Sequence, residues 1–287
     1  HYPAPYALLD VWNNYYGSAQ MMEQEALSVA SLVQGDTVRN LIRVFFLQSR
    51  LKGLGNKKTF QPTHVHVIGA GIMGGDIAAW CVLRGFKVTL QEREPKYLSQ
   101  AFERAHQLFS RKLKTTHERN HAIDRLIPDC DGNGVPHADV VIEAIFENIE
   151  AKQAIYKDIE PRMKEGAILA TNTSSIPLET LSEVLSDASR LVGLHFFNPV
   201  AMMPLVEVVI KADTPDDVIK KALSFCSHIG KIPLTVNDSP GFLVNRILVP
   251  YLIEAVTLHE EGIAAEAIDK AAIDFGMPMG PVELADT

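Results

Sequence analysis

The chain has 287 residues, of which 47% are apolar, and a formal net charge of −8. This composition can build a sizeable core, so it excludes a globally disordered chain, and the negative charge excludes non-specific nucleic-acid binding. No apolar stretch reaches the roughly 20 residues of a membrane span, and no signal-peptide pattern opens the sequence. Three widely spaced cysteines favour a reducing compartment over a disulfide framework or a metal site. We therefore expect a cytoplasmic protein with one large or two ordinary domains and no metal centre.

Residues 1–55 have helical patterning and no strand signal. Apolar residues recur at helical spacing over 18–33 and 37–51, which predicts a helix in each range. The two glycines and one proline of residues 53–63, Gly53, Gly55 and Pro62, then predict a linker. Because the chain opens without methionine and stops just after an apparent helix start, we expect a fragment of a longer protein.

Strands and helices alternate from residue 65 to about residue 237. The pattern predicts strands over 65–68, 87–90, 140–143, 168–171, 191–195, 206–209 and 232–236. The helices predicted between them include 76–84, 96–114, 149–163 and 215–228. This alternation predicts an α/β fold, a Rossmann-like doubly wound sheet that is mostly parallel.

The remaining segments are a turn and a helical region. Residues 129–134 predict a surface turn. From residue 241 onward the pattern is purely helical, with helices over 242–262 and 266–275, which predicts the truncated start of an all-helical domain. The expected domains are a helical tail and linker over 1–55, a dinucleotide-binding domain over 63–238, and the truncated helical domain over 239–287.

The most informative local pattern is a glycine loop between the first strand and the next helix. The sequence reads Gly69-Ala-Gly71-Ile72-Met73-Gly74. Gly69 permits the tight turn, Gly71 lets the backbone approach a pyrophosphate, and Gly74 lets the helix pack near the sheet. The free N–H groups of the helix start, those of Ile72 and Met73 included, can then bind phosphate.

A carboxylate follows the second predicted strand at a suitable distance from the loop. Glu92 lies 18 residues after Gly74, near the spacing expected for the acid that binds a ribose 2′-hydroxyl. A carboxylate there would repel a 2′-phosphate, so NAD is favoured over NADP. Arg93 is a counter-signal, since an arginine can accommodate that phosphate.

Polar residues gather after later strands, at the sheet edge where ligands bind in open α/β folds. An alcohol dehydrogenase needs a base for the hydroxyl proton, and histidine titrates near neutrality. His195 and Glu207 are candidates for a base and the carboxylate that orients it. Ser174 and Asn245 could then bind the reacting oxygen.

Each candidate also has a structural alternative. His195 could be a hydrogen-bonded core residue, and Glu207 needs some buried partner because a carboxylate in an apolar strand is costly. The Asn172–Ser175 segment could cap the next helix, and Asn245 could be a satisfied amide on a helix face. Eight further histidines occupy expected surface or filler positions, namely His64, His66, His106, His117, His121, His137, His228 and His259.

Six motifs in this order resemble the L-3-hydroxyacyl-CoA dehydrogenases of fatty-acid β-oxidation. They are Gly69–Gly75, Val141–Asn148, Thr171–Ser175, Gly193–Pro199, Leu205–Val208 and Pro240–Arg246. The resemblance covers roughly residues 63–287. It implies oxidation of (S)-3-hydroxyacyl-CoA to 3-oxoacyl-CoA with NAD as cofactor.

The resemblance also implies roles for individual residues. His195 would be the general base and Glu207 its partner, with Ser174 and Asn245 lining the substrate. Contacts to NAD would come from Glu147, Lys152, Ser174 and Asn198 in addition to the glycine loop and Glu92. Family members usually carry aspartate where this chain has Glu92.

The N-terminal segment resembles the tail of an enoyl-CoA hydratase/isomerase domain and the helix that joins it to the dehydrogenase. This likeness implies a multifunctional α-subunit of a bacterial fatty-acid oxidation complex, with a thiolase subunit and a homo-oligomer of the full-length protein as partners. Two alternatives stay open: a stand-alone short-chain 3-hydroxybutyryl-CoA dehydrogenase, and a fragment that binds NAD without turnover.

Overall fold

The computed structural model describes residues 2–286, which form two compact units. The larger unit runs from Leu51 to Leu248. The smaller one combines the residues up to Arg50 with those from Val249 onward. The expected domains over 1–55, 63–238 and 239–287 remain a prediction.

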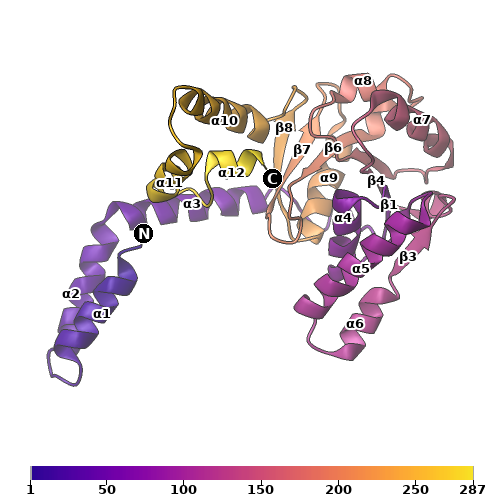
Figure 1. Ribbon diagram of the computed structural model, residues 1–287. Helices are drawn as coiled ribbons and strands as arrows, with labels where there is room; N and C mark the ends of the chain where they lie inside the picture. Colours follow the sequence, from indigo (N-terminus) through magenta and orange to yellow (C-terminus); the bar gives the residue numbers. More distant parts are fainter. Residues whose placement is uncertain (1, 287) are drawn as a thin grey trace. The chain divides into compact units, whose positions relative to one another are not determined.

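The larger unit is built on an eight-stranded sheet with the strand order β3-β2-β1-β4-β5-β6-β7-β8 (Figure 1). The strands are β1 (His64–Ile68), β2 (Lys87–Gln91), β3 (Leu126–Asp129), β4 (Val140–Glu143), β5 (Ile168–Thr171), β6 (Leu191–Phe196), β7 (Leu205–Ile210) and β8 (Ile232–Asn237). All neighbouring strands are parallel except β6 and β7. The predicted doubly wound, mostly parallel sheet is confirmed, and the order from β3 to β6 is that of dinucleotide-binding folds.

Helices cover both faces of this sheet. They are α4 (Ile72–Leu83), α5 (Pro95–Lys112), α6 (Thr116–Ile123), α7 (Ile149–Ile159), α8 (Leu178–Ser182) and α9 (Asp216–His228). One core cluster contains side chains of α4, α5 and α9, and the other contains side chains of α7 and α8. Alternate residues of β4 supply the two clusters, with Val140 and Ile142 in the first and Val141 in the second. A sheet buried on both faces explains why its strands are almost continuously apolar.

Three details differ from expectation. Helix α4 begins at Ile72, four residues before the predicted start at Asp76, so Gly74 lies inside the helix. His64 and His66 are buried on β1 and not at the surface. The hydroxyl of Thr89 on β2 satisfies their ring nitrogens, at 2.9 Å from His64 Nε2 and 2.7 Å from His66 Nδ1. The predicted turn over 129–134 begins with a buried Asp129, whose carboxylate accepts three backbone N–H groups.

The smaller unit is helical, as predicted. It contains α1 (Ala4–Tyr15), α2 (Met21–Gln34), most of α3 (Asp36–Lys52), most of α10 (Val244–Glu260), α11 (Ala265–Phe275) and α12 (Pro281–Ala285). Among the described residues, no helix is both long enough and apolar enough to cross a membrane.

Candidate active site

The glycine loop between β1 and α4 has the geometry that its sequence predicts. Gly69 has a φ of +101°, which side chains other than glycine rarely adopt, and a Cβ there would lie 2.6 Å from the Ala144 oxygen. A Cβ on Gly74 would lie 2.0 Å from the Gly69 oxygen, so α4 packs directly against the turn. A Cβ on Gly71 would meet no heavy atom within 4 Å. The open space over Gly71, at the start of α4, fits a pyrophosphate.

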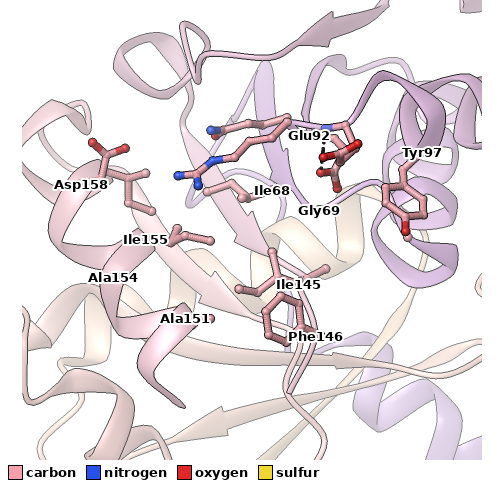
Figure 2. A pocket seen from close by; sticks show the side chains of 16 residues that line it. Ile68, Gly69, Glu92, Tyr97, Ile145, Phe146, Ala151, Ala154, Ile155 and Asp158 are labelled. Atoms are coloured by element: carbon pink, nitrogen blue, oxygen red, sulfur yellow. Dashed lines mark hydrogen bonds between the residues drawn. The ribbon is translucent and has the colours of Figure 1, made fainter. Parts of the chain in front are cut away.

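A cavity of about 650 Å³ opens beside the loop (Figure 2). Gly69, Gly71 and Glu92 line one side of it, and Ala151, Ala154 and Ile155 of α7 line another. These predominantly apolar walls next to the glycine loop fit a planar base joined to a phosphate. The chain therefore holds the two parts that a dinucleotide needs, a phosphate cradle and an apolar slot.

Glu92 lines this cavity and comes directly after β2. Its Oε2 accepts the Ala70 N–H at 3.2 Å and its Oε1 accepts the Glu94 N–H at 3.2 Å. Each oxygen keeps a further lone pair, so the carboxylate is held in place and can still accept a ribose hydroxyl.

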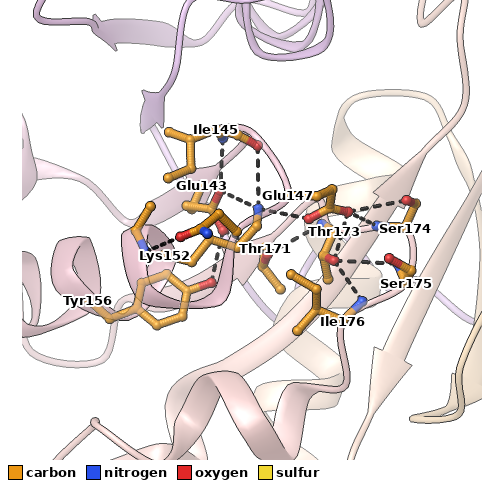
Figure 3. A network of polar contacts seen from close by, with 12 residues as sticks. Glu143, Ile145, Glu147, Lys152, Tyr156, Thr171, Thr173, Ser174, Ser175 and Ile176 are labelled. Carbon is orange, nitrogen blue, oxygen red and sulfur yellow. Dashed lines mark hydrogen bonds and ion pairs between the residues drawn. The ribbon is translucent and has the colours of Figure 1, made fainter.

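A buried polar network lies where β4 and β5 end (Figure 3). Its centre is the fully buried Glu143. Oε1 of Glu143 accepts the Ile145 N–H at 2.8 Å and the Lys152 Nζ at 2.7 Å. Oε2 accepts the hydroxyls of Tyr156 at 2.9 Å and Thr171 at 2.8 Å. Burial and the neighbouring Glu143 carboxylate raise the pKa of Tyr156 well above its ordinary value, so the phenol remains a donor.

Lys152 joins this network to Ser174 through a second carboxylate. Its Nζ lies 3.3 Å from Glu147 Oε2, while Glu147 Oε1 accepts the Ser174 N–H at 2.6 Å and the Ser174 hydroxyl at 3.1 Å. Burial raises the pKa of Glu147, but the Ser174 N–H, Lys152 and the Thr173 hydroxyl together outweigh it and hold the pKa below its ordinary value. The side chain therefore stays an acceptor for Ser174.

His195 and Glu207 face each other across the antiparallel pair of β6 and β7. Their Cα positions are register partners, and His195 Nδ1 lies 2.8 Å from Glu207 Oε2. Burial raises the pKa of Glu207, but the His195 hydrogen bond and the N–H groups of Val244 and Leu243 outweigh it, so the pKa lies below its ordinary value. The ionised carboxylate accepts the Nδ1 proton and leaves His195 Nε2 as the basic nitrogen. The rings of Phe197 and Phe242 lie 4.6 Å and 5.5 Å from the imidazole.

The start of α10 is fixed by the same carboxylate. Glu207 Oε1 accepts the backbone N–H of Leu243 at 3.0 Å and of Val244 at 2.9 Å. Phe242, just before them, has a φ of +51° and is almost fully buried, a backbone conformation that costs about 1–2 kcal/mol outside glycine. Asn245 follows, and its Nδ2 donates to the backbone carbonyl of Ser174 at 3.5 Å.

Six of the predicted residues thus lie in one connected set of contacts. They are His195, Glu207, Asn245, Ser174, Glu147 and Lys152, with Glu207 linked to Asn245 through the backbone N–H groups of Leu243 and Val244. Asn198 is separate from it, exposed in the turn between β6 and β7. The capping alternative for Asn172–Ser175 is wrong, because α8 begins at Leu178 with Pro177 as its N-cap.

Sequence reasoning missed Glu143, Tyr156, Thr171 and Phe242. A signal for Glu143 was present, since it ends the apolar strand Val140–Glu143 just as Glu207 interrupts an apolar strand, and both needed buried partners. Phe242 had no such signal, because an aromatic residue at a helix start is unremarkable.

A dinucleotide cradle and a histidine–carboxylate pair on one mostly parallel sheet are the parts of a dinucleotide-dependent dehydrogenase. Residues 64–239 match the family model described as "3-hydroxyacyl-CoA dehydrogenase, NAD binding domain", and residues 241–287 match that of the C-terminal domain of the same enzymes. The chain belongs to the 3-hydroxyacyl-CoA dehydrogenase family, whose cofactor is NAD.

Proteins similar to this chain carry corresponding names. The fatty acid oxidation complex subunit alpha of Shewanella baltica is 36% identical over 296 residues, which cover 100% of this chain and 42% of the relative. The chain thus spans less than half the length of this curated relative. The solved 3-hydroxybutyryl-CoA dehydrogenase of Escherichia coli superposes with a TM-score of 0.74 at 36% identity, covering 79% of this chain and 49% of the other. The (S)-3-hydroxybutyryl-CoA dehydrogenase of Ralstonia eutropha gives 0.73 at 35%, covering 79% and 82%.

Proposed function

We propose that this chain carries the site that oxidises (S)-3-hydroxyacyl-CoA to 3-oxoacyl-CoA with NAD. The observation that carries the proposal is the 2.8 Å contact between His195 Nδ1 and the buried Glu207 carboxylate. This contact supplies an oriented base in a chain whose family model is that of an NAD-dependent dehydrogenase.

His195 would take the proton of the substrate hydroxyl on Nε2. The charge that appears on the imidazole would be stabilised by Glu207, which is ionised and already accepts the Nδ1 proton. Bound NAD⁺ would accept the hydride, which leaves the carbon that bears this hydroxyl. Proton and hydride together convert the secondary alcohol into a ketone.

Ser174 and Asn245 would line the substrate and hydrogen-bond the reacting oxygen. The side-chain amide of Asn245 donates to the backbone carbonyl of Ser174, and Glu147 accepts the Ser174 hydroxyl. Glu147 and Asn198 would contact the nicotinamide half of the cofactor, and the buried Lys152 would act there through Glu147, 3.3 Å from its Nζ. The loop from Gly69 to Gly74 and Glu92 would hold the pyrophosphate and the adenosine ribose. Glu92 favours NAD over NADP, since it would repel a 2′-phosphate.

The relatives support a proposal for the substrate class and the partners. The fatty acid oxidation complex subunit alpha aligns with all of this chain, including its N-terminal helices. The two solved 3-hydroxybutyryl-CoA dehydrogenases each cover 79% of it. This difference favours a multifunctional α-subunit over a stand-alone enzyme. The full-length protein would then work with a thiolase subunit and as a homo-oligomer, as the resemblance implies. Three unpaired cysteines favour the cytoplasm.

Acetoacetyl-CoA reduction by NADH tests the assignment. His195→Asn and Glu207→Gln should each lower kcat by about 10²–10⁴-fold, the usual contribution of a general base and of its orienting acid, with the Kd for NADH little changed. His106→Asn and Glu165→Gln, at exposed positions, are the matched controls and should keep wild-type turnover. Turnover within threefold of wild type in either site variant would refute the roles.

The short-chain alternative rests on the two solved 3-hydroxybutyryl-CoA dehydrogenases. A series of 3-oxoacyl-CoA substrates from four to sixteen carbons separates the two functions. A kcat/KM that falls steeply beyond four carbons would favour the stand-alone enzyme, and a flat or rising series favours the complex subunit.

A further inference from the structure

An acidic side chain lies in an unexpected place beside the phosphate cradle. Asp76 is the fifth residue of α4, one turn from the helix start at Ile72 where the pyrophosphate is expected. The helix start carries about half a positive charge, and a full negative charge within a turn of it opposes binding of an anion. A free carboxylate at Asp76 would therefore weaken the very site that the glycine loop builds.

Arg104 of α5 contacts both Asp76 and the loop. Its Nε donates to Asp76 Oδ1 at 3.2 Å, and its Nη2 donates to the Gly71 carbonyl at 2.8 Å. About a third of each side chain is exposed. One guanidinium thus neutralises the acid and binds the central glycine of the cradle.

Gly75 makes this contact sterically feasible. A Cβ at Gly75 would lie 2.7 Å from Arg104 Nη2 and 2.8 Å from the Cβ of Ala101. Helix α5 can approach α4 this closely only because residue 75 has no side chain. The close approach brings the guanidinium within reach of Gly71.

The Gly71 carbonyl is fixed from two directions. It accepts the Gly75 N–H at 3.0 Å in addition to Arg104. In a trans peptide the N–H points opposite to the carbonyl, so fixing the Gly71 oxygen also aims the Ile72 N–H toward the helix start. A charged donor on the carbonyl polarises the peptide and makes that N–H a stronger donor.

We propose that Arg104 is a positioning residue for the dinucleotide pyrophosphate, acting through the Gly71 peptide and by cancelling the charge of Asp76. The proposal rests on the cofactor half of the proposed function and is independent of the substrate. The competing interpretation is a purely structural tether between α4 and α5.

Ligand binding by calorimetry distinguishes the two interpretations. The ligands are NAD⁺, ADP-ribose and adenosine, the last without phosphate. Arg104→Met should lower the affinities for NAD⁺ and ADP-ribose about five- to tenfold, which is the effect of losing one partly exposed charged hydrogen bond. The affinity for adenosine should stay within about twofold of wild type. Arg104→Lys, which keeps the charge and loses the two-sided contact, should fall between Arg104→Met and wild type.

A second substitution separates charge from tethering. In Asp76→Asn/Arg104→Met the acid that needed cancelling is absent, so NAD⁺ affinity should return to within about threefold of wild type. Arg111→Met is the matched control, because Arg111 lies on the same helix and its Nε hydrogen bond goes to Gln107 of that helix. It should bind all three ligands as wild type does.

Three results would overturn the proposal. They are unchanged NAD⁺ affinity in Arg104→Met, an equal loss for adenosine, and no recovery in the double variant. Denaturation midpoints of every variant show whether α5 stays packed. A lower midpoint together with an equal loss of affinity for all three ligands would mean that Asp76 and Arg104 only tether α4 to α5. If wild type binds NAD⁺ but does not reduce acetoacetyl-CoA, the proposed function fails and this proposal stands.

Discussion

Removing either partner of the buried pair of Glu143 and Lys152 should destabilise the larger unit by several kcal/mol. Their side chains are 0% and 1% exposed and their charged atoms lie 2.7 Å apart. Glu143→Gln would keep the shape, and its amide oxygen could still accept the Ile145 N–H and Lys152, while the Tyr156 and Thr171 hydroxyls can rotate to accept from the new amide. The loss is therefore mainly the charge that balances Lys152.

Removing one partner of a buried ion pair costs about 3–5 kcal/mol. We expect the lower end, about 3 kcal/mol, because Glu147 stays 3.3 Å from Lys152. For a unit of this size that corresponds to a fall in Tm of about 6–12 °C. Lys152→Met should cost a similar amount, and the double variant should be about 2 kcal/mol more stable than the sum of the two predicts.

Urea unfolding followed by tryptophan fluorescence measures these changes. The chain has two tryptophans, Trp12 in the smaller unit and Trp80 in the larger one, so a Trp12→Phe background reports the larger unit alone. Asp216→Asn is the control, since its partner Lys220 lies 3.8 Å away in an exposed pair that should contribute under about 0.5 kcal/mol. Additivity of the two buried variants within about 0.5 kcal/mol would refute the reasoning.

Two further predictions concern His66 and the glycine loop. Burial lowers the pKa of His66 from 6.5 to about 4, so between these pH values the unfolded chain binds a proton that the folded chain does not. The free energy of unfolding should therefore be complete above pH 6.5 and fall by about 3 kcal/mol as the pH drops through 4. His66→Gln should flatten this part of the stability–pH curve, and a wild-type curve already flat between pH 6.5 and 4 would contradict the prediction. Gly71→Ala should leave the Tm within about 2 °C and weaken NAD⁺ binding at least tenfold, because the added methyl group projects into the cradle. Gly69→Ala should lower both the Tm and the NAD⁺ affinity, because of its φ of +101° and its contact with Ala144. Calorimetry and thermal melts on the two variants test this, and equal melting temperatures would count against it.

The sheet could be predicted because its strands are apolar and alternate with helices. Strand β3 could not, since Pro128 lies in Leu126–Asp129 and argues against a central strand. The structure resolves the conflict by placing β3 at the edge of the sheet, next to β2.

Whether a polar residue's role could be predicted depends on how far away its partners lie in the sequence. His195 and Glu207 carry a signal in their own strands, and a cross-strand partner was the natural inference. His66 was misassigned because its partners, Thr89 and Gln91, belong to a strand more than 20 residues away. Arg104 and Asp76 are separated by 28 residues on two helices, so no local pattern joins them.

Glu207 connects the base to the rest of the site through both of its oxygens. Oε2 accepts from His195, and Oε1 accepts from the backbone that leads into Asn245. Glutamine has one acceptor oxygen, so Glu207→Gln can satisfy only one side. If the oxygen stays with the Leu243 and Val244 N–H groups, the amide faces His195 Nδ1, which must then accept, and the proton moves to Nε2 where the substrate needs a base. If the oxygen turns to His195, two N–H groups at the start of α10 lose their acceptor and Asn245 is released from Ser174. Either arrangement disables the reaction, so one carboxylate sets both the tautomer of the base and the position of the amide.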